Sequence, residues 1–201
     1  NRVLKIMFFR GTIAALALAL ITLSGCSTPD AQKQFPELTF NHLPPIRLDV
    51  AEIEYAPRYL APANKPNIGH EFPTPPVVAA ERWIADRLVA VGTRGKAIVT
   101  IREATATEAR LPLKKGVTGA FTTDQEWRYD AIVDIAVEVS DLDRQRSARA
   151  NAGAKQTRTV GEDASLADRE KVWFDLVEQL MKRFDATFEA QIRKDLAAFI
   201  R

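Results

Sequence analysis

The stretch WRYDAIVDIAVEVS, residues 127–140, decides the fold class of this chain. Every second side chain from Trp127 to Val139 is apolar, which is the period of a β-strand that buries one face. The alternate positions carry mainly polar side chains, including three carboxylates: Asp130, Asp134 and Glu138. We interpret these carboxylates as part of a solvated face rather than as a cation site, because Arg128 lies among them. The pattern therefore predicts an antiparallel sheet with one core face.

Three other segments also alternate between apolar and polar residues and are predicted to be strands. They cover about residues 46–50, 97–110 and 146–159, and the last of them places alanines on its inner face. Small residues on an inner face let a helix approach the sheet closely. A proline-rich loop at residues 56–74 separates the first strand from the first predicted helix, and loops of this length are usually functional or disordered.

Apolar residues at three- and four-residue spacing predict two helices that pack on this sheet. We expect Thr74 to cap the first helix, with Pro75 at its first position, and Gly92 to end it. Ser165 and Asp168 form a capping box for the second helix, which is expected to run to the C-terminus. At ~1.5 Å per residue, about 35 residues make ~50 Å of helix, so its distal end is expected to overhang the body. The apolar residues of that end either dock a partner helix or complete the core: Phe188, Ile192, Leu196 and Phe199.

The first 25 residues are predicted to be a signal peptide. Three basic residues precede an apolar run at residues 11–23: Arg2, Lys5 and Arg10. This run has the length of a secretory signal and is shorter than the ~20 apolar residues that span a bilayer. These 25 residues contain no acidic side chain. The rest of the chain therefore carries 25 of the 28 basic residues and all 26 acidic residues, and is nearly neutral. A near-neutral body offers no basic patch for nucleic acid, and we expect no nucleic-acid partner.

The apolar run ends in Leu23-Ser24-Gly25-Cys26, which resembles the lipobox of bacterial lipoproteins. The resemblance implies that Cys26, the single cysteine, is lipidated and becomes the first residue of the exported chain. Ser27 follows instead of an aspartate, which by the usual sorting rule implies the outer membrane, with the protein facing the periplasm. A plain signal peptide or an N-terminal anchor helix is the alternative.

The elements together predict an α+β fold in the order strand, helix, strand, strand, strand, helix. We expect a mostly antiparallel four-stranded sheet with both helices on one face. Ten of the eleven prolines fall between residues 29 and 76, so a flexible tether is expected at 26–43 and a single periplasmic domain at 44–201. A chain of 201 residues with 46% apolar residues is long enough to bury one core.

The element order over residues 46–201, behind a lipobox, resembles two groups of small outer-membrane lipoproteins. These are the lipopolysaccharide-assembly lipoprotein and the auxiliary lipoproteins of ABC-type lipid transport systems. The body contains no family motif, so Cys26 is the one functional residue that the resemblance carries over. It implies a non-enzymatic accessory protein in outer-membrane assembly or lipid transport. Its expected partners are the membrane, through Cys26, and an envelope protein, either a β-barrel or a transporter.

Side chains with catalytic potential are few in this sequence. His42 lies in the proline-rich spacer, and His70 stands beside Glu71 in the long loop. His70 and Glu71 could act as an acid/base pair or as metal ligands, but an HExxH motif is absent and no second cysteine is present to complete a zinc site. We therefore expect no enzymatic activity, no cofactor and no metal.

The loop that comes after the strand at 97–110 is the candidate contact with a membrane surface or a partner protein. It combines two lysines with four apolar residues: Leu111, Leu113, Val117 and Phe121. A hairpin loop folded back on the core is the alternative. Two other functions stay open, namely a periplasmic carrier that holds an acyl chain between helix and sheet, and a periplasmic enzyme that uses His70 and Glu71.

Overall fold

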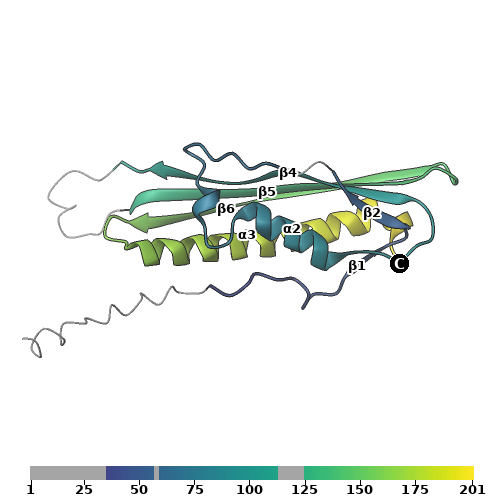
Figure 1. Cartoon of the computed structure of the whole chain (residues 1–201), viewed down its shortest axis with the longest axis horizontal. Coiled ribbons are helices and arrows are strands. Elements are labelled where there is room, and N and C mark those ends of the chain that lie inside the picture. Colours follow the sequence, from purple (N-terminus) through teal and green to yellow (C-terminus); the bar gives the residue numbers. More distant parts are fainter. Residues whose placement is uncertain (1–34, 57–58, 113–124) are drawn as a thin grey trace, which may run out of the picture. The chain divides into compact units, whose positions relative to one another are not determined.

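The computed structural model describes residues 35–56, 59–112 and 125–201 (Figure 1). In chain order its elements are β1 (Ile46–Leu48), β2 (Glu52–Tyr55), η2 (Gly69–Glu71), α2 (Pro76–Arg87), β3 (Leu88–Ala90), β4 (Lys96–Arg110), β5 (Gln125–Asp141), β6 (Arg146–Gly161), α3 (Leu166–Asp195) and η4 (Ala197–Phe199). The predicted α+β class is confirmed. In these ranges no helix is both long and apolar enough to cross a membrane.

The strands form two sheets, whereas the sequence predicted a single, mostly antiparallel sheet of four strands. The larger sheet has the order β2-β4-β5-β6, in which β2 is parallel to β4 and the other pairs are antiparallel. The smaller sheet pairs β1 with β3 in parallel. The strand predicted at 46–50 ends at Leu48, and the chain then moves to the other sheet at Glu52. The predicted element order therefore lacked β2 and β3.

The two parallel pairs follow from the position of α2 in the chain. β1 and β2 both precede α2, while β3 and β4 both come after it. A connection that contains a helix returns the chain in its original direction, which makes the joined strands parallel. The link between β1 and β2 touches the link between β3 and β4 at Gly92. A Cβ atom there would lie 2.5 Å from Asp49 Oδ1 and 2.6 Å from the Val50 nitrogen. Gly92 thus permits a close approach of backbone rather than ending the helix.

Helix α2 is shorter than the sequence predicts at both ends. Pro75 is its N-cap and Pro76 its first residue, and the cap makes no side-chain hydrogen bond, so Thr74 is not the cap. The helix ends at Arg87 because the next three residues, β3, form the ladder with β1. That ladder supplies the hydrogen bonds that further helical turns would otherwise have made.

Helix α3 begins as predicted, because Ser165 and Asp168 form both bonds of a capping box. The predicted overhang of its distal end was wrong. The four apolar residues there are almost fully buried and complete the core: Phe188, Ile192, Leu196 and Phe199. The chain end packs back onto the small sheet, where the Asp49 N–H donates to the Phe199 carbonyl oxygen at 2.7 Å. Of the two roles considered for these residues, completion of the core is therefore the one observed.

The core lies between the helices and the inner face of the larger sheet (Figure 1). Strand β5 buries alternate residues as its sequence predicts, with Val133, Ile135 and Val137 fully covered and Trp127 partly covered. On β6 the buried residues are three alanines, Ala150, Ala152 and Ala154, and Val160 near the end of the strand. Helix α3 packs against this strand, as predicted for a row of small residues.

The segment at residues 35–43 is packed onto the domain, so a tether that extends to residue 43 is contradicted. The Phe35 ring stacks on Phe174 of α3, with the ring centroids 5.3 Å apart. Phe40 is buried, and its N–H donates to Asp86 Oδ2 at 2.6 Å. Apolar side chains in a proline-rich stretch can be buried without regular structure, and the described domain accordingly begins by Phe35.

Candidate functional site

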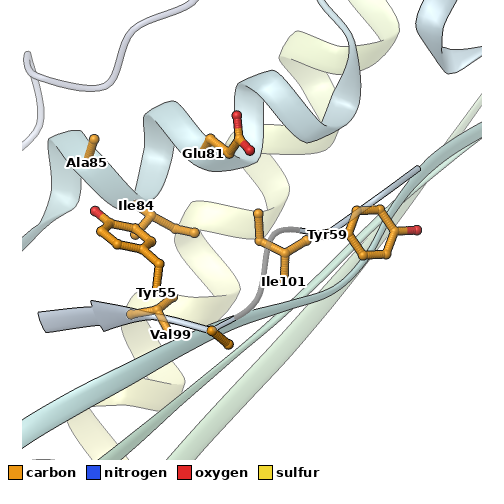
Figure 2. Close-up of a pocket in the computed structure, with 8 residues that line it drawn as sticks. Tyr55, Tyr59, Glu81, Ile84, Ala85, Val99 and Ile101 are labelled. Carbon is orange, nitrogen blue, oxygen red and sulfur yellow. The ribbon is translucent and has the colours of Figure 1, made fainter.

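A pocket of about 350 Å³ lies between α2 and the edge of the larger sheet (Figure 2). Its described lining comes from β2 and the residues after it, from α2 and from β4. The lining residues are Tyr55, Ala56, Tyr59, Glu81, Ile84, Ala85, Val99 and Ile101. A volume of this size is at the lower end of the range that small-molecule sites occupy, ~300–1,000 Å³.

The register of β2 on β4 opens this pocket. Tyr55 is the last residue of β2 and pairs with Val99, so β4 continues beyond its partner strand. Ile101 lies two residues further along the inner face of β4 and is only partly buried. The edge that β2 leaves uncovered thus presents an apolar floor to the helix above it.

Helix α2 forms the opposite wall through residues on one of its faces. Glu81, Ile84 and Ala85 are three and four positions apart, which places them on one side of a helix. Ala85 is small and leaves space that a larger side chain would fill. In Figure 2 the rings of Tyr55 and Tyr59 lie at opposite sides of the view with Ile101 between them, and Glu81 lies above them on α2.

The pocket is mainly apolar and has one charged group among its described lining residues. That group is the carboxylate of Glu81, which makes no ion pair with another described residue. The two tyrosines add hydroxyl groups, and Tyr55 is 61% exposed. This arrangement suits an apolar group that carries a hydrogen-bond donor or a positive charge near one side.

The structure does not bring the two histidines together. His70 lies on η2 with its Nε2 3.8 Å from Glu71 Oε1, and both side chains are about half exposed. It borders a separate pocket of about 180 Å³ next to Ala106 of β4. His42 lines a third pocket, of about 440 Å³, beside Glu178 and Lys182 of α3.

The carboxylates of β5 lie on the outer face of the sheet, as predicted, and each is bound by a basic side chain. Asp134 accepts from Arg102 at 2.6 Å, and Glu138 pairs with Arg149 at 3.3 Å. Asp130 accepts from Thr157 at 2.6 Å and from Arg128 at 2.9 Å. The part of the chain that the structure describes contains no group of three His, Cys, Asp or Glu side chains placed to hold a metal ion.

The electrostatics of Asp130 agree with this ion-paired arrangement. Partial burial raises the pKa of its carboxyl group, but the hydrogen bond from Thr157 and the charges of Arg128 and Lys155 lower it by more. The net pKa of Asp130 is therefore below its ordinary value. A carboxylate held ionised by neighbouring cations acts as a surface ion-pair partner rather than as a proton donor near neutral pH.

Most of the site residues predicted from the sequence lie outside the described ranges. These are Leu23, Ser24, Gly25 and Cys26 of the lipobox and Leu113, Val117 and Phe121 of the predicted contact loop. Leu111 is described: it is partly buried, and its N–H donates to the Glu126 carbonyl oxygen at 2.7 Å. That bond closes the base of the β4–β5 connection.

Sequence patterns alone do not identify the pocket between α2 and β4. Ile84, Val99 and Ile101 fit the spacing of their own elements, and Tyr55 and Tyr59 stand where the predicted loop begins. The one signal in the sequence is that two of the three tyrosines of the chain lie within five residues. Nothing in a local pattern shows that this tyrosine pair faces a helix some thirty residues later.

No protein-family model matches this chain, and no curated protein matches it.

Proposed function

We propose that this protein is a non-enzymatic, lipid-anchored envelope protein that acts by binding, as an accessory subunit in outer-membrane assembly or lipid transport. The Leu23–Cys26 lipobox behind an apolar run supports export and lipid anchoring. The observation that carries the binding role is the apolar pocket between α2 and β4, with the carboxylate of Glu81 among its walls. Aliphatic and aromatic walls with few polar groups are typical of binding sites.

The test of the binding role uses a photo-crosslinking amino acid in place of Tyr59, in the full chain and in its native membrane. Irradiation is expected to yield a discrete adduct, because Tyr59 lines the pocket. The matched control places the same amino acid at Ala190, an exposed position on α3. An equal adduct pattern from the two positions would contradict a role for the pocket.

Two variants, each with an alanine replaced by phenylalanine, then distinguish binding in the pocket from binding elsewhere on the surface. Ala85→Phe fills the pocket from α2 and is expected to remove the Tyr59 adduct. Ala190→Phe adds the same side chain to an exposed turn of α3 and should leave the adduct unchanged. If the adduct persists in a folded Ala85→Phe protein, the occupant binds elsewhere and the proposed binding site is wrong.

An acyl-chain carrier is the second candidate function, and the same pocket favours it. The space proposed for the acyl chain between the last helix and the alanine row is closed, because Ala150, Ala152 and Ala154 are buried. The pocket at Ile101 is instead the apolar space next to the sheet. Two experiments distinguish the functions. A bound lipid that native mass spectrometry detects in the detergent-extracted protein, and that Ala85→Phe displaces, supports the carrier. A photo-crosslinked protein adduct at position 59 supports the accessory subunit.

The enzyme alternative rests on His70 and Glu71. Their side chains are 3.8 Å apart, near enough to interact but beyond a hydrogen bond. Replacing both by Ala should leave the function of the protein unchanged at full abundance. Loss of function in that variant, with a normal Ala85→Phe protein, would replace the binding proposal by a catalytic or metal site.

A further inference from the structure

The short covalent distance between Cys26 and the folded domain limits how this protein can stand on a membrane. Eight residues separate Cys26 from Phe35, which stacks on Phe174. An extended chain spans at most about 3.3–3.6 Å per residue, so Phe35 can lie no further than about 30 Å from the lipidated cysteine. This limit rests on the proposed lipid anchor.

Phe35 lies near one end of the domain. Its partner Phe174 is eight residues after the start of α3, about 12 Å along the helix. The neighbouring Trp173 packs edge-on against Tyr129 of β5, with ring centroids 5.6 Å apart, which places Phe35 at the level of Tyr129 along the strand. The start of α3, the end of β4 and the start of β5 all lie at this end, at the left of Figure 1.

The opposite end of the domain lies beyond the reach of the anchor in an end-on orientation. The β5–β6 turn at Leu142 is thirteen residues from Tyr129, or about 43 Å along a strand at ~3.3 Å per residue. If that turn faced the lipid, Phe35 would stand about 43 Å above the surface. The connecting chain spans only about 30 Å, so this orientation is excluded.

The end that the anchor can reach also carries side chains suited to a lipid interface. Leu166 is 66% exposed at the start of α3, and Leu111 and Trp127 are only partly covered. The guanidinium groups of Arg110 and Arg169 lie 5.9 and 5.7 Å from the centre of the Trp127 ring. Aromatic and leucine side chains beside arginines are the composition that proteins place at the boundary between headgroups and acyl chains.

We infer that Leu111, Trp127 and Leu166, flanked by Arg110 and Arg169, form a membrane-facing end that lies against the lipid surface holding Cys26. The occupant of this surface is a lipid bilayer, because the anchor holds this end, and not the Leu142 end, next to one. The charge of Arg169 favours headgroups of negative charge, whereas Arg110 is already paired with Glu126 at 2.7 Å. The pocket between α2 and β4 belongs to a different part of the domain, lined by β2, α2 and the start of β4.

Quenching of tryptophan fluorescence by brominated lipid tests this orientation. Two matched variants are made in a Trp127→Phe background of the full lipidated protein: Leu166→Trp at the membrane-facing end and Leu142→Trp at the opposite turn. Both leucines are highly exposed, at 66% and 87%, so either tryptophan is tolerated by the fold. Each protein is reconstituted into vesicles of phosphatidylglycerol and brominated phosphatidylethanolamine.

The expected result is loss of the added fluorescence and a blue shift for Leu166→Trp, with neither change for Leu142→Trp. Vesicle flotation of the same samples reports the anchor separately. If the protein floats and Leu166→Trp is no more quenched than Leu142→Trp, the orientation is wrong while the anchor stands. If Cys26→Ala protein floats as well as the parent, the anchor is wrong and the orientation falls with it.

Discussion

The guanidinium group of Arg87 lies 2.7 Å from the carboxylate of Asp185 and joins the end of α2 to the middle of α3. The Arg87 side chain is 1% exposed, and its Nη2 also donates to Glu189 Oε2 at 2.6 Å. Trp83 donates to the same Asp185 oxygen at 2.8 Å. A buried cation is thus held by two carboxylates of one helix, and this contact fixes the position of α2 above the pocket.

Removing this cation should destabilise the domain strongly. Arg87→Ala removes the cation that Asp185 and Glu189 share, although Glu189 keeps its ion pair with Arg193, and breaking a buried ion pair in this way costs about 3–5 kcal/mol. The matched control is Arg82→Ala on the same helix, which breaks the more exposed pair with Glu37 and should cost about 0–1 kcal/mol. Urea denaturation of both variants measures the two free energies of unfolding. Equal losses would show that the buried pair has no special role.

Neighbouring residues of β5 should differ sharply in their contribution to stability. Ile135 is fully buried, so Ile135→Ala creates a cavity and should cost about 2–5 kcal/mol. Asp134 lies on the outer face in an ion pair with Arg102, and Asp134→Ala should cost about 0–1 kcal/mol. The comparison is made by denaturant titration at neutral pH. A large loss for Asp134→Ala would contradict the assignment of faces.

The domain should require the segment that begins at Phe35. A fragment of residues 35–201 is expected to melt cooperatively with mixed helix and sheet signals in circular dichroism. A fragment of residues 44–201 lacks the buried ring of Phe40, and loss of a buried phenylalanine costs about 3–5 kcal/mol. The shorter fragment should therefore melt at a lower temperature. Identical melting curves would restore residue 44 as the domain boundary.

Acid should destabilise the domain through Glu189, which is paired with Arg193 of the same helix and with Arg87 of α2. The hydrogen bond from Arg193 lowers the pKa of this carboxyl group most, burial opposes the shift, and Arg87 lowers the pKa further. Because the pKa is lower in the folded state, the stabilisation is present above the ordinary value near 4.5 and is lost as the pH falls through the folded pKa.

The measurement is the free energy of unfolding as a function of pH, for the parent and for Glu189→Gln. The variant should be less stable at neutral pH and should lose less stability than the parent below about pH 4. Glu178→Gln, on an exposed turn of the same helix, is the control. Parallel curves for the parent and Glu189→Gln would refute the assignment.

Much of the fold was predictable because several elements have strong local signals. The two-residue period of β5 and the Ser165–Asp168 capping box each depend on residues close together in the chain. The small strands were not predictable in this way, since β1 and β3 have three residues each. Three alternating residues do not distinguish a strand from a loop, and the last turn of a helix can carry the same residues.

The candidate site was less predictable than the fold, because its residues come from separate segments. Tyr55, Glu81 and Ile101 meet where α2 crosses the edge of β4. Their convergence depends on the Tyr55–Val99 register and on the Arg87–Asp185 contact, neither of which a periodic pattern encodes. His70, which the sequence offered instead together with Glu71, borders a separate pocket.

The sequence by itself determined the α+β class, the buried face of β5, the start of α3 and the prediction of a lipid anchor at Cys26. Each of these depends on residue spacing or on a motif formed by residues close together in the sequence. Only the tertiary structure decided that β1 and β2 join different sheets, that the end of α3 is buried, and that a pocket opens at Ile101. The physical reason is that strand pairing and burial are relations between distant segments, which are set by the crossover through α2 and by close approaches such as that at Gly92.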